Sequence, residues 1–321
     1  MNLIEAFEKT KVSGFHSETD QIIESAISKL FFYGDRVLKV YKYEKYFFGD
    51  FSSHSFRKEF YQEDFRWNHA MAPHVYVALK GVKEIGDGYE QVNLDNAKDF
   101  YIEMKKIDVE KNLTNLLLVK QVSRADLEKI AAEMTIRIQN LTRDEKEKLK
   151  PLAKKGWFDL LQENLKDLRH WAYMADPKLP RIKSDELMDV LEKAFREEEY
   201  FKNFDLENLS ITLDNHSDNI LLLNGNVEFL DIMPPKKNWR IADPYFNICR
   251  PAVDVMVIGT SNEAKVMYHA YEKIAPTVPP RVKTIYEIRS SIIRTSYFYF
   301  LEKPDLAKKY LDFTEAKLQT L

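Results

Sequence analysis

Short apolar runs separated by polar turns dominate the first hundred residues of the chain. Residues 26–33 and 36–41 are rich in Ile, Phe, Val and Tyr and flank Gly34-Asp35, so they predict a β-hairpin. Residues 75–84 and 100–107 have the same character and predict two further strands. This part of the chain is therefore predicted to consist mainly of β-structure.

The hydrophobic spacing becomes helical in one segment of this region and in most of the chain beyond it. Residues 56–71 have apolar side chains at helical spacing, from Phe56 to Met71, and Pro73 lies just past the end of this pattern. From residue 108 onward, amphipathic patterns predict a series of further helices: 124–141, 157–173, 184–195, 244–257, 264–274, 282–300 and 306–318.

A second β-hairpin interrupts this helical series. Two apolar runs, 220–223 and 227–230, flank Asn224-Gly225. This dipeptide between alternating apolar runs is the strongest short sequence signal for a tight hairpin turn. The second part of the chain is therefore predicted to be helical with one embedded hairpin.

Three polar side chains bracket that hairpin. Asp214 lies in the loop before the first strand, Asn219 at the start of that strand, and Asp231 at the exit of the second. Kinase-like phosphotransferases need one Asp that accepts the proton of the substrate hydroxyl, and an Asn and an Asp that hold magnesium on the nucleotide phosphates. The spacing predicts these roles here, and the alternative is a polar loop that merely precedes a hairpin.

The segment 212–231 resembles the catalytic loop and metal segment of the aminoglycoside-phosphotransferase-like kinases, whose pattern is His-Gly-Asp-Leu-His-x-Gly-Asn. Asp214, His216 and Asn219 match this pattern. The chain departs from it at four positions: Thr212, Leu213, Asn215 and Asp218. Downstream, Asp243-Pro-Tyr-Phe-Asn247 is similar to the family's Asp-Pro-x-Tyr-Asp segment, with Asn247 where a second Asp is usual.

The N-terminal region resembles one uncharacterised bacterial subgroup of that family. Its members carry Glu-Thr-His-Ile-Ser before a hairpin that ends in Gly-Asp-Arg-Val-x-Lys, and residues 24–28 and 34–39 are similar to these segments. The subgroup's Asp-Phe-Ser and Asn-x-x-Leu-Ala-Pro-x-Val-Tyr segments correspond to residues 50–52 and 68–76. The resemblance covers roughly residues 20 to 300.

This resemblance implies an α+β, protein-kinase-like fold with two lobes. A small β-rich N-terminal lobe, residues 1–107, would hold the nucleotide-binding sheet and one long helix. A larger helical C-terminal lobe, residues 108–321, would hold the catalytic β-hairpin, the catalytic loop, the metal site and the substrate side.

Lys39 receives a specific role from the resemblance. Kinases hold the α- and β-phosphates with a strand lysine, and Lys39 lies late in the second strand of the first hairpin. The alternative role is that of an edge-strand lysine that prevents aggregation. A phosphate-binding lysine needs a helix carboxylate to orient it. Glu63 is preferred over Glu59 because it lies nearer Pro73, and Asp64 is a further alternative because the subgroup's Glu may align there.

The rest of the nucleotide site is also implied by the resemblance. No Gly-x-Gly-x-x-Gly loop precedes Lys39, so the turn around Ser25 and Ser28 would cover the phosphates through backbone N–H groups and hydroxyls. Residues 100–106 would lead into the hinge between the lobes, where backbone groups near Met104 and Lys106 would contact adenine.

Composition and charge restrict the partners. The 321 residues are 45% hydrophobic, which provides ample core, and the net charge of −3 gives no reason to expect nucleic acid or a membrane surface as a partner. No apolar run approaches the ~20 residues of a membrane span, and no signal peptide is evident. The single cysteine, Cys249, is predicted to be a buried apolar residue and fits a reducing cytoplasm.

The sequence thus predicts a cytoplasmic enzyme, a phosphotransferase that uses ATP and Mg²⁺ to phosphorylate a hydroxyl of a small molecule. Two alternatives remain. A pseudokinase would fit the departures at Thr212, Asp218 and Asn247, together with Met233-Pro234-Pro235 after Asp231, and a protein kinase would act on a partner protein. The identity of the acceptor and the oligomeric state are not encoded in any motif found.

Overall fold

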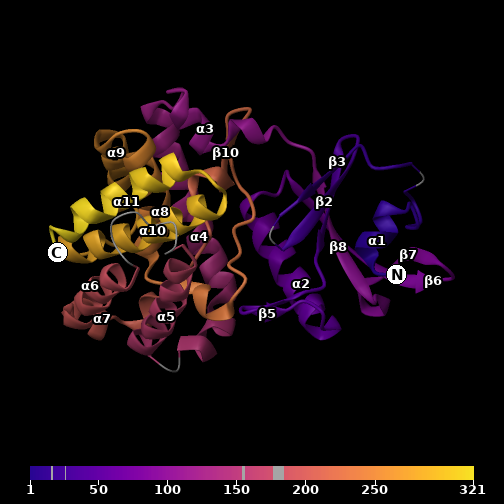
Figure 1. Ribbon diagram of the computed structural model, residues 1–321, viewed down its shortest axis with the longest axis horizontal. Helices are drawn as coiled ribbons and strands as arrows, with labels where there is room; N and C mark the ends of the chain where they lie inside the picture. The colour runs from indigo at the N-terminus through magenta and orange to yellow at the C-terminus, as the bar shows by residue number, and fades with distance from the viewer. Residues whose placement is uncertain (16, 26, 154–155, 176–183) are drawn as a thin grey trace. The chain divides into compact units, whose positions relative to one another are not determined.

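Among the residues that the structure describes, the N-terminal part of the chain forms an antiparallel sheet of six strands (Figure 1). The computed structural model describes residues 1–15, 17–25, 27–153, 156–175 and 184–321, so Ala26, the first residue of a predicted strand, lies outside them. The strand order is β1-β2-β3-β8-β6-β7. The bounds are β1 (Gln21–Glu24), β2 (Ser28–Tyr33), β3 (Arg36–Tyr41), β6 (Tyr76–Ile85), β7 (Gly88–Val92), β8 (Asp99–Lys105), and, for the helices of this part, α1 (Leu3–Glu8) and α2 (His54–Met71).

Both faces of this sheet are covered at its centre. On one face, Phe7 of α1 belongs to the same buried core as Leu38 of β3. On the other face, the Tyr41 ring contacts the Tyr61 ring of α2 at a centroid distance of 4.9 Å. Because successive strand side chains point to opposite faces, β3 is buried on both sides. Lys39 points to the same face as Tyr41, the one that α2 covers.

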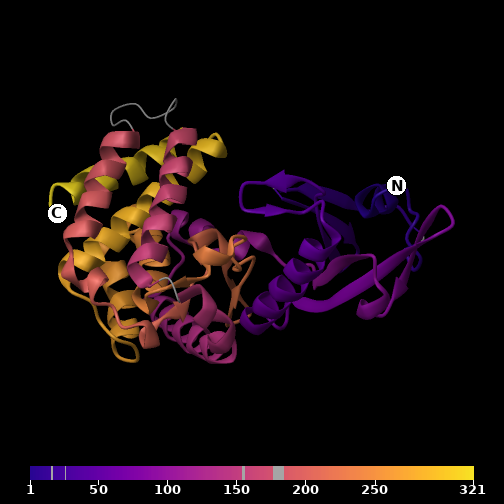
Figure 2. The same ribbon diagram turned by 90° about the horizontal axis from the view of Figure 1, so that it is seen from below.

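Helices dominate the rest of the chain, and α10 is central among them because it packs against α5, α6, α8 and α11 (Figures 1 and 2). A further contact joins α4 and α9. The bounds are α3 (Leu113–Leu118), α4 (Arg124–Ala153), α5 (Trp157–Ala175), α6 (Ser184–Glu197), α7 (Glu199–Lys202), α8 (Pro244–Ile258), α9 (Ser261–Glu272), α10 (Pro280–Phe300) and α11 (Pro304–Leu318).

The embedded hairpin forms where the sequence predicts it. Strands β10 (Ile220–Leu223) and β11 (Asn226–Phe229) pair with each other. Asn224 and Gly225 between them adopt φ of 50° and 78°, which is the left-handed conformation that a type I′ turn requires at both positions. A second short pair joins β9 (Ser210–Ile211) to β12 (Ile241–Ala242), and the loop before the hairpin and the hairpin itself lie between these two strands in the sequence.

The described residues cluster into two compact units. The first unit comprises Met1–Val109 and Glu228–Lys236, and the second comprises Glu110–Val227 and Lys237–Leu321. Asp231 therefore belongs to the unit of the large sheet, whereas Asp214 and Asn219 belong to the helical unit. It stays a prediction that residues 1–107 form a lobe that binds the nucleotide and that residues 108–321 form a lobe that binds the substrate.

The predicted elements are present, with three kinds of difference. The helix predicted over 124–141 continues to Ala153, and Leu149, two turns beyond Leu141, is buried on it. The strands β1 and β7 are short and carry little hydrophobic signal. The helices α1, α3 and α7 are too short for a periodic pattern to show them.

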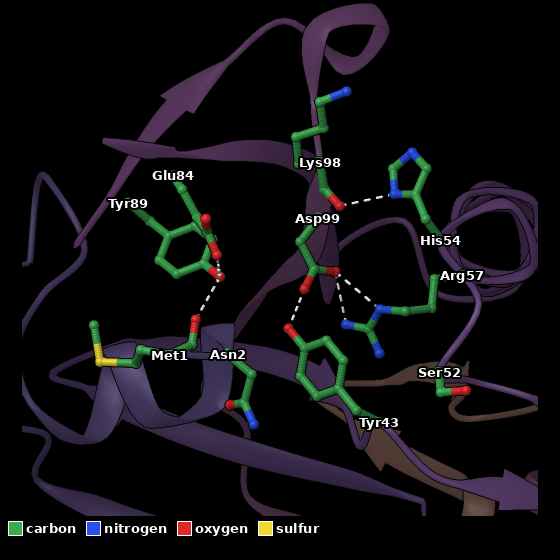
Figure 3. Close-up of a pocket in the computed structure, with 10 residues that line it drawn as sticks. All are labelled: Met1, Asn2, Tyr43, Ser52, His54, Arg57, Glu84, Tyr89, Lys98 and Asp99. Atoms are coloured by element: carbon green, nitrogen blue, oxygen red, sulfur yellow. Dashed lines mark hydrogen bonds and ion pairs between the residues drawn. The ribbon is translucent and has the colours of Figure 1, made fainter. Parts of the chain in front are cut away.

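A buried ion pair ties α2 to the large sheet (Figure 3). Arg57 donates from Nη2 and Nε to Asp99 Oδ1 at 2.7 and 3.0 Å, and both side chains are almost fully buried. The Tyr43 hydroxyl donates to the same carboxylate, and Arg57 Nη1 donates to the Tyr41 carbonyl at 2.9 Å. This network connects α2 to the end of β3 and the start of β8.

We expect Asp99→Ala to lower the free energy of unfolding by about 3–5 kcal/mol, because it leaves the Arg57 guanidinium buried without its carboxylate. The double replacement Arg57→Met with Asp99→Leu should cost less than the single one, since no unpaired charge remains. Urea unfolding followed by circular dichroism measures both. Glu90→Ala, which breaks the exposed Lys83–Glu90 pair of β6 and β7, is the control and should cost at most ~1 kcal/mol. An equal loss from Asp99→Ala and Glu90→Ala would contradict this expectation.

Candidate functional site

Lys39 is buried in the middle of the large sheet. It pairs in register with Leu30 of β2 and Ile102 of β8, so it does not lie on an edge strand. Its side chain is only 4% exposed. An ammonium group at such a position is costly unless carboxylates compensate its charge.

Two carboxylates compensate that charge. Lys39 Nζ lies 2.5 Å from Asp231 Oδ1 and 3.6 Å from Asp64 Oδ2. Burial by itself would lower the pKa of Lys39, but the two carboxylates outweigh it and hold the pKa well above its ordinary value. Lys39 is therefore a permanent cation.

The helix carboxylate beside Lys39 is that of Asp64, which corrects the sequence-based preference for Glu63. Asp64 is 1% exposed and lies one helical turn before the buried Asn68, so it belongs to the face of α2 that meets the sheet. Glu59 is exposed and Glu63 only half-buried, because helical periodicity rotates both away from that face. Distance from Pro73 along the chain carries no information about this rotation.

The same face of α2 also fixes the backbone at Asp231. Asn68 Nδ2 donates to Asp64 Oδ1 at 2.8 Å, and Asn68 Oδ1 accepts from the Ile232 N–H at 3.0 Å. The Asp231 N–H donates to the Tyr76 hydroxyl at 3.0 Å. Asp231 adopts φ of 49°, a left-handed conformation that non-glycine residues rarely hold without such support. Its carboxylate remains 62% exposed although it contacts Lys39.

The remaining predicted nucleotide contacts lie in the same unit. Ser25 and Ser28 form a turn between β1 and β2, in which the Ser28 N–H donates to Ser25 Oγ at 3.0 Å and the two hydroxyls lie 2.8 Å apart. Met104 pairs with Val37 and Tyr76 near the end of β8, and the Lys106 N–H donates to the Asp35 carbonyl. A phosphate or adenine contact at these places stays a prediction.

In the helical unit, Asp214 lies in the loop between β9 and the hairpin and forms an ion pair with Arg250 of α8. Its side chain is 42% exposed. Burial would raise the pKa of Asp214, but Arg250, with His216 and Arg294, outweighs this effect and lowers the pKa below its ordinary value. The carboxylate is thus ionised at neutral pH.

One face of α8 holds the loop that carries Asp214. Asn247 Oδ1 accepts from the Leu213 N–H at 3.0 Å, and its Nδ2 donates to the Ile211 carbonyl at 2.8 Å. Asp254 Oδ2 accepts from the Ser217 N–H at 2.7 Å. Asn247, Arg250 and Asp254 follow one another at helical spacing, so a single face of the helix contacts the loop before, at and after Asp214.

The other polar residues of this loop also have partners. Asn219 Nδ2 donates to the Asp214 carbonyl at 2.8 Å, which joins the two predicted catalytic residues directly. Asp218 lies 2.8 Å from Arg294 Nη2 and 3.3 Å from His216 Nδ1. Burial acts to raise the pKa of Asp218, but His216 and Arg294 lower it strongly below its usual range. Asp218 is therefore an anionic anchor for the loop.

The sequence did not reveal the supporting residues Asn68, Arg250 and Asp254. The sequence nevertheless contained an indication of their role, because each is a polar residue that interrupts the apolar pattern on the buried face of a helix. Asp254 accepts from Ser217, Arg294 and Tyr310 and is completely buried. Only the paired groups, which come from distant segments, explain why these polar residues occupy core positions.

A separate pocket of about 310 Å³ lies in the first unit and contains none of the predicted site residues (Figure 3). It is lined by the Arg57–Asp99 pair, Tyr43 and Tyr89, with parts of the N-terminal segment. The Tyr89 hydroxyl donates to the Met1 carbonyl at 2.9 Å. The polar groups in this pocket bond mainly to one another, which indicates a structural role.

Comparison with solved structures shows which fold the chain has. No family model matches it, and no curated protein matches its sequence. The structure of APH(2")-IIia in complex with GDP and kanamycin is 13% identical, with a TM-score of 0.54 over 99% of this chain and 98% of that chain. The choline kinase from Cryptosporidium parvum Iowa II is 13% identical, with a TM-score of 0.53 over 98% and 94%. Spectinomycin phosphotransferase APH(9)-Ia, bound to AMP, is 12% identical, with a TM-score of 0.52 over 97% and 98%.

The chain has the aminoglycoside-phosphotransferase-like kinase fold.

This kinase-like fold confirms the fold class predicted from the sequence, with a β-rich first part and a helical second part that contains the hairpin. At 12–13% identity the similarity concerns the fold alone. The roles of Lys39, Asp214, Asn219 and Asp231 in this kinase-like fold therefore stay predictions about the site.

We expect Lys39 and Asp64 to be energetically coupled. In a double-mutant cycle of Lys39→Met and Asp64→Asn, the unfolding free energies should be non-additive by roughly 0.5–3 kcal/mol, because the two side chains form one ion pair. The matched cycle of Lys39→Met with Glu63→Gln should be additive within about 0.5 kcal/mol. Urea unfolding of the single and double variants gives both values. Coupling to Glu63 and none to Asp64 would restore the original preference.

Proposed function

We propose that this protein is a kinase that transfers the γ-phosphate of ATP to a hydroxyl of a small molecule. The observation that carries this proposal is the buried cation of Lys39, which lies between Asp64 and Asp231 in a chain with a kinase-like fold. A lysine in the centre of a sheet destabilises the fold relative to an apolar residue. A role in binding nucleotide phosphates accounts for its presence.

In the proposed reaction, Asp214 accepts the proton of the acceptor hydroxyl. The hydroxyl oxygen forms a bond to the γ-phosphorus, the bond from that phosphorus to the β–γ bridging oxygen breaks, and ADP leaves. Lys39 neutralises negative charge on the α- and β-phosphates. Positioning and electrostatic effects of this kind supply most of the rate acceleration in phosphoryl transfer.

Asn219 and Asp231 fit the chemistry of a magnesium site. Their amide and carboxylate oxygens are hard ligands of the kind that Mg²⁺ prefers, and the Asp231 carboxylate is largely exposed. Among the described residues, no three His, Cys, Asp or Glu side chains gather as a metal site. Two protein ligands of this kind would act together with nucleotide phosphates and water. When bound, magnesium would neutralise charge on the phosphates.

The compared structures support the choice of substrates. They bind nucleotides, GDP in one case and AMP in another, and one of them also binds kanamycin. By analogy with these complexes, we infer that this chain binds a nucleotide and a small-molecule acceptor, and we propose no role for nucleic acid or a membrane. No helix among the described residues is long and apolar enough to cross a membrane. A cytoplasmic location remains part of the proposal.

A pseudokinase is the second candidate, and the Arg250–Asp214 ion pair favours it because Arg250 occupies the proposed base. Two departures from the family pattern argue against it. Asn247 uses both its amide oxygen and its amide nitrogen to hold the loop, and Asp218 anchors the loop through Arg294. These substitutions therefore keep the loop ordered and do not dismantle it.

We expect Asp214→Asn to reduce magnesium-dependent ATP turnover by about 10²–10⁴-fold, the range for loss of a general base. The affinity for ATP should remain within about threefold of the wild-type value, since the carboxylate acts on the acceptor and not on the nucleotide. A coupled assay for ADP release measures turnover, and calorimetry measures affinity. Asp205→Asn, an exposed carboxylate of the same unit, is the control. Wild-type turnover in Asp214→Asn would exclude this residue as the base.

The dependence of turnover on pH tests the Arg250–Asp214 pair. Because the pKa of Asp214 is lowered, the base stays ionised as pH falls, and activity is lost only when pH passes below this lowered pKa. Arg250→Gln removes the main lowering charge but leaves the burial. We therefore expect the acid limb of the kcat/KM profile to move to higher pH in this variant. Arg281→Gln, an exposed arginine of the same unit, should leave the limb unchanged. An unmoved limb in Arg250→Gln would separate that limb from Asp214.

A further inference from the structure

Arg289 of α10 is a buried arginine that lacks an ionic partner. It is 8% exposed, and among the described residues it forms neither an ion pair nor a hydrogen bond through its side chain; its Nε is buried without an acceptor. Its guanidinium stacks on the Phe246 ring of α8 at 4.0 Å. Burial, and then the neighbouring Arg250 guanidinium, lower the pKa of Arg289 to about 10.

The buried acids around α8 and α10 are bound to other groups. Asp243 accepts from Tyr200, Tyr286 and the Tyr245 N–H. Glu287 accepts from Tyr268 and Lys317, and Asp254 accepts from Arg294. Each buried arginine of this region except Arg289 therefore has a carboxylate, and Arg289 is left with a surplus positive charge.

Arg250 lies beside this surplus charge. Its guanidinium is 6.0 Å from the centroid of the same Phe246 ring, and its Nε is also buried without an acceptor. Its ion pair with Asp214 places this double cation next to the proposed catalytic base. Arg250 has only the carboxylate of Asp214 and Arg289 has none, so the two neighbouring guanidinium groups carry one positive charge in excess, which a bound anion would balance.

We propose that Arg289 and Arg250 form the binding site for an anionic group of the acceptor substrate. The acceptor would then be a small alcohol that bears a carboxylate or a phosphate. The planar donor forks of guanidinium groups suit both kinds of oxyanion, and the adjacent Asp214 would receive the hydroxyl of the same molecule. A cationic acceptor, such as an amino alcohol, would be repelled. This substrate class rests on the proposed kinase function, whereas the anion site rests on the two arginines alone.

Thermal unfolding of the purified full-length chain tests the anion site without nucleotide. The probes are inorganic phosphate, glycerol 3-phosphate, glycolate, glycerol, ethylene glycol and 2-aminoethanol, at constant ionic strength. We expect phosphate and glycolate to raise the Tm of the wild type in a saturable manner, and the neutral and cationic probes to leave it unchanged. Glycerol 3-phosphate compared with glycerol, and glycolate compared with ethylene glycol, distinguish a phosphate from a carboxylate ligand.

Arg289→Met should weaken the binding of both anions by about tenfold or more, as measured by calorimetry. Without anions its Tm should equal or exceed that of the wild type, because an unpaired buried charge is removed. A purely structural arginine would instead lower the Tm when replaced. Arg281→Gln, an exposed arginine of the same helix that pairs with Glu197, should bind anions like the wild type. Arg289→Lys keeps the positive charge but loses the planar pair of guanidinium donors, so it should bind anions with intermediate affinity. This variant provides a second measurement of anion affinity if Arg289→Met does not fold.

Three results would overturn the inference: no anion response in the wild type, an unchanged response in both Arg289 variants, or selective stabilisation by 2-aminoethanol. Its failure can be told apart from failure of the proposed function. Magnesium-dependent ATP turnover by a protein whose anion binding ignores Arg289 would overturn the anion site and leave the kinase function in place. Anion binding through Arg289 in a protein without any ATP turnover would support the anion site and contradict the kinase function.

Discussion

The need to satisfy buried polar backbone groups governs the region around Asp214. The loop between β9 and β10 is irregular, so its N–H and C=O groups have no ladder partners, and leaving them unpaired in the interior would cost about 1–3 kcal/mol each. Asn247 and Asp254 of α8 supply these partners at Ile211, Leu213 and Ser217. Because both come from one helix face, these hydrogen bonds tie the loop to α8 on both sides of Asp214.

In the unit of the large sheet, a helix provides similar support. There α2 uses Asp64 and Asn68, which lie one turn apart, to hold Lys39 and the backbone at Ile232. In both units a helix that is otherwise packed by apolar side chains carries a few polar residues on its buried face. These residues contact Lys39 or the backbone next to Asp214 and Asp231, so each helix fixes the position of a predicted site residue through its own packing.

This arrangement gives physical meaning to departures from the family pattern. An amide at position 247 donates and accepts at once, which a carboxylate cannot do, and the loop uses both functions. Asp218, in place of a glycine, is balanced by Arg294, which in turn is held by Asp254. In the sequence alone, these substitutions suggest that catalysis has been lost. Their hydrogen bonds in the structure suggest instead that a different set of side chains supports the loop. The surplus cation at Arg289 is the one charge of this region, within the described residues, that the scaffold does not use.

The sequence by itself determined the longer secondary elements and the polar residues of the segment predicted to be catalytic. Asn224-Gly225 encodes its turn locally, because only the conformation of those two residues matters, and the helical and strand periodicities are likewise local. The partner of Lys39 could not be determined in this way. The choice between Glu59, Glu63 and Asp64 depends on which face of α2 meets the sheet, and only the packed structure selects Asp64. The same holds for Arg250, Asp254 and Arg289. Their charges are visible in the sequence, but whether each charge is paired depends on side chains that lie far away along the chain and that only tertiary packing brings into contact.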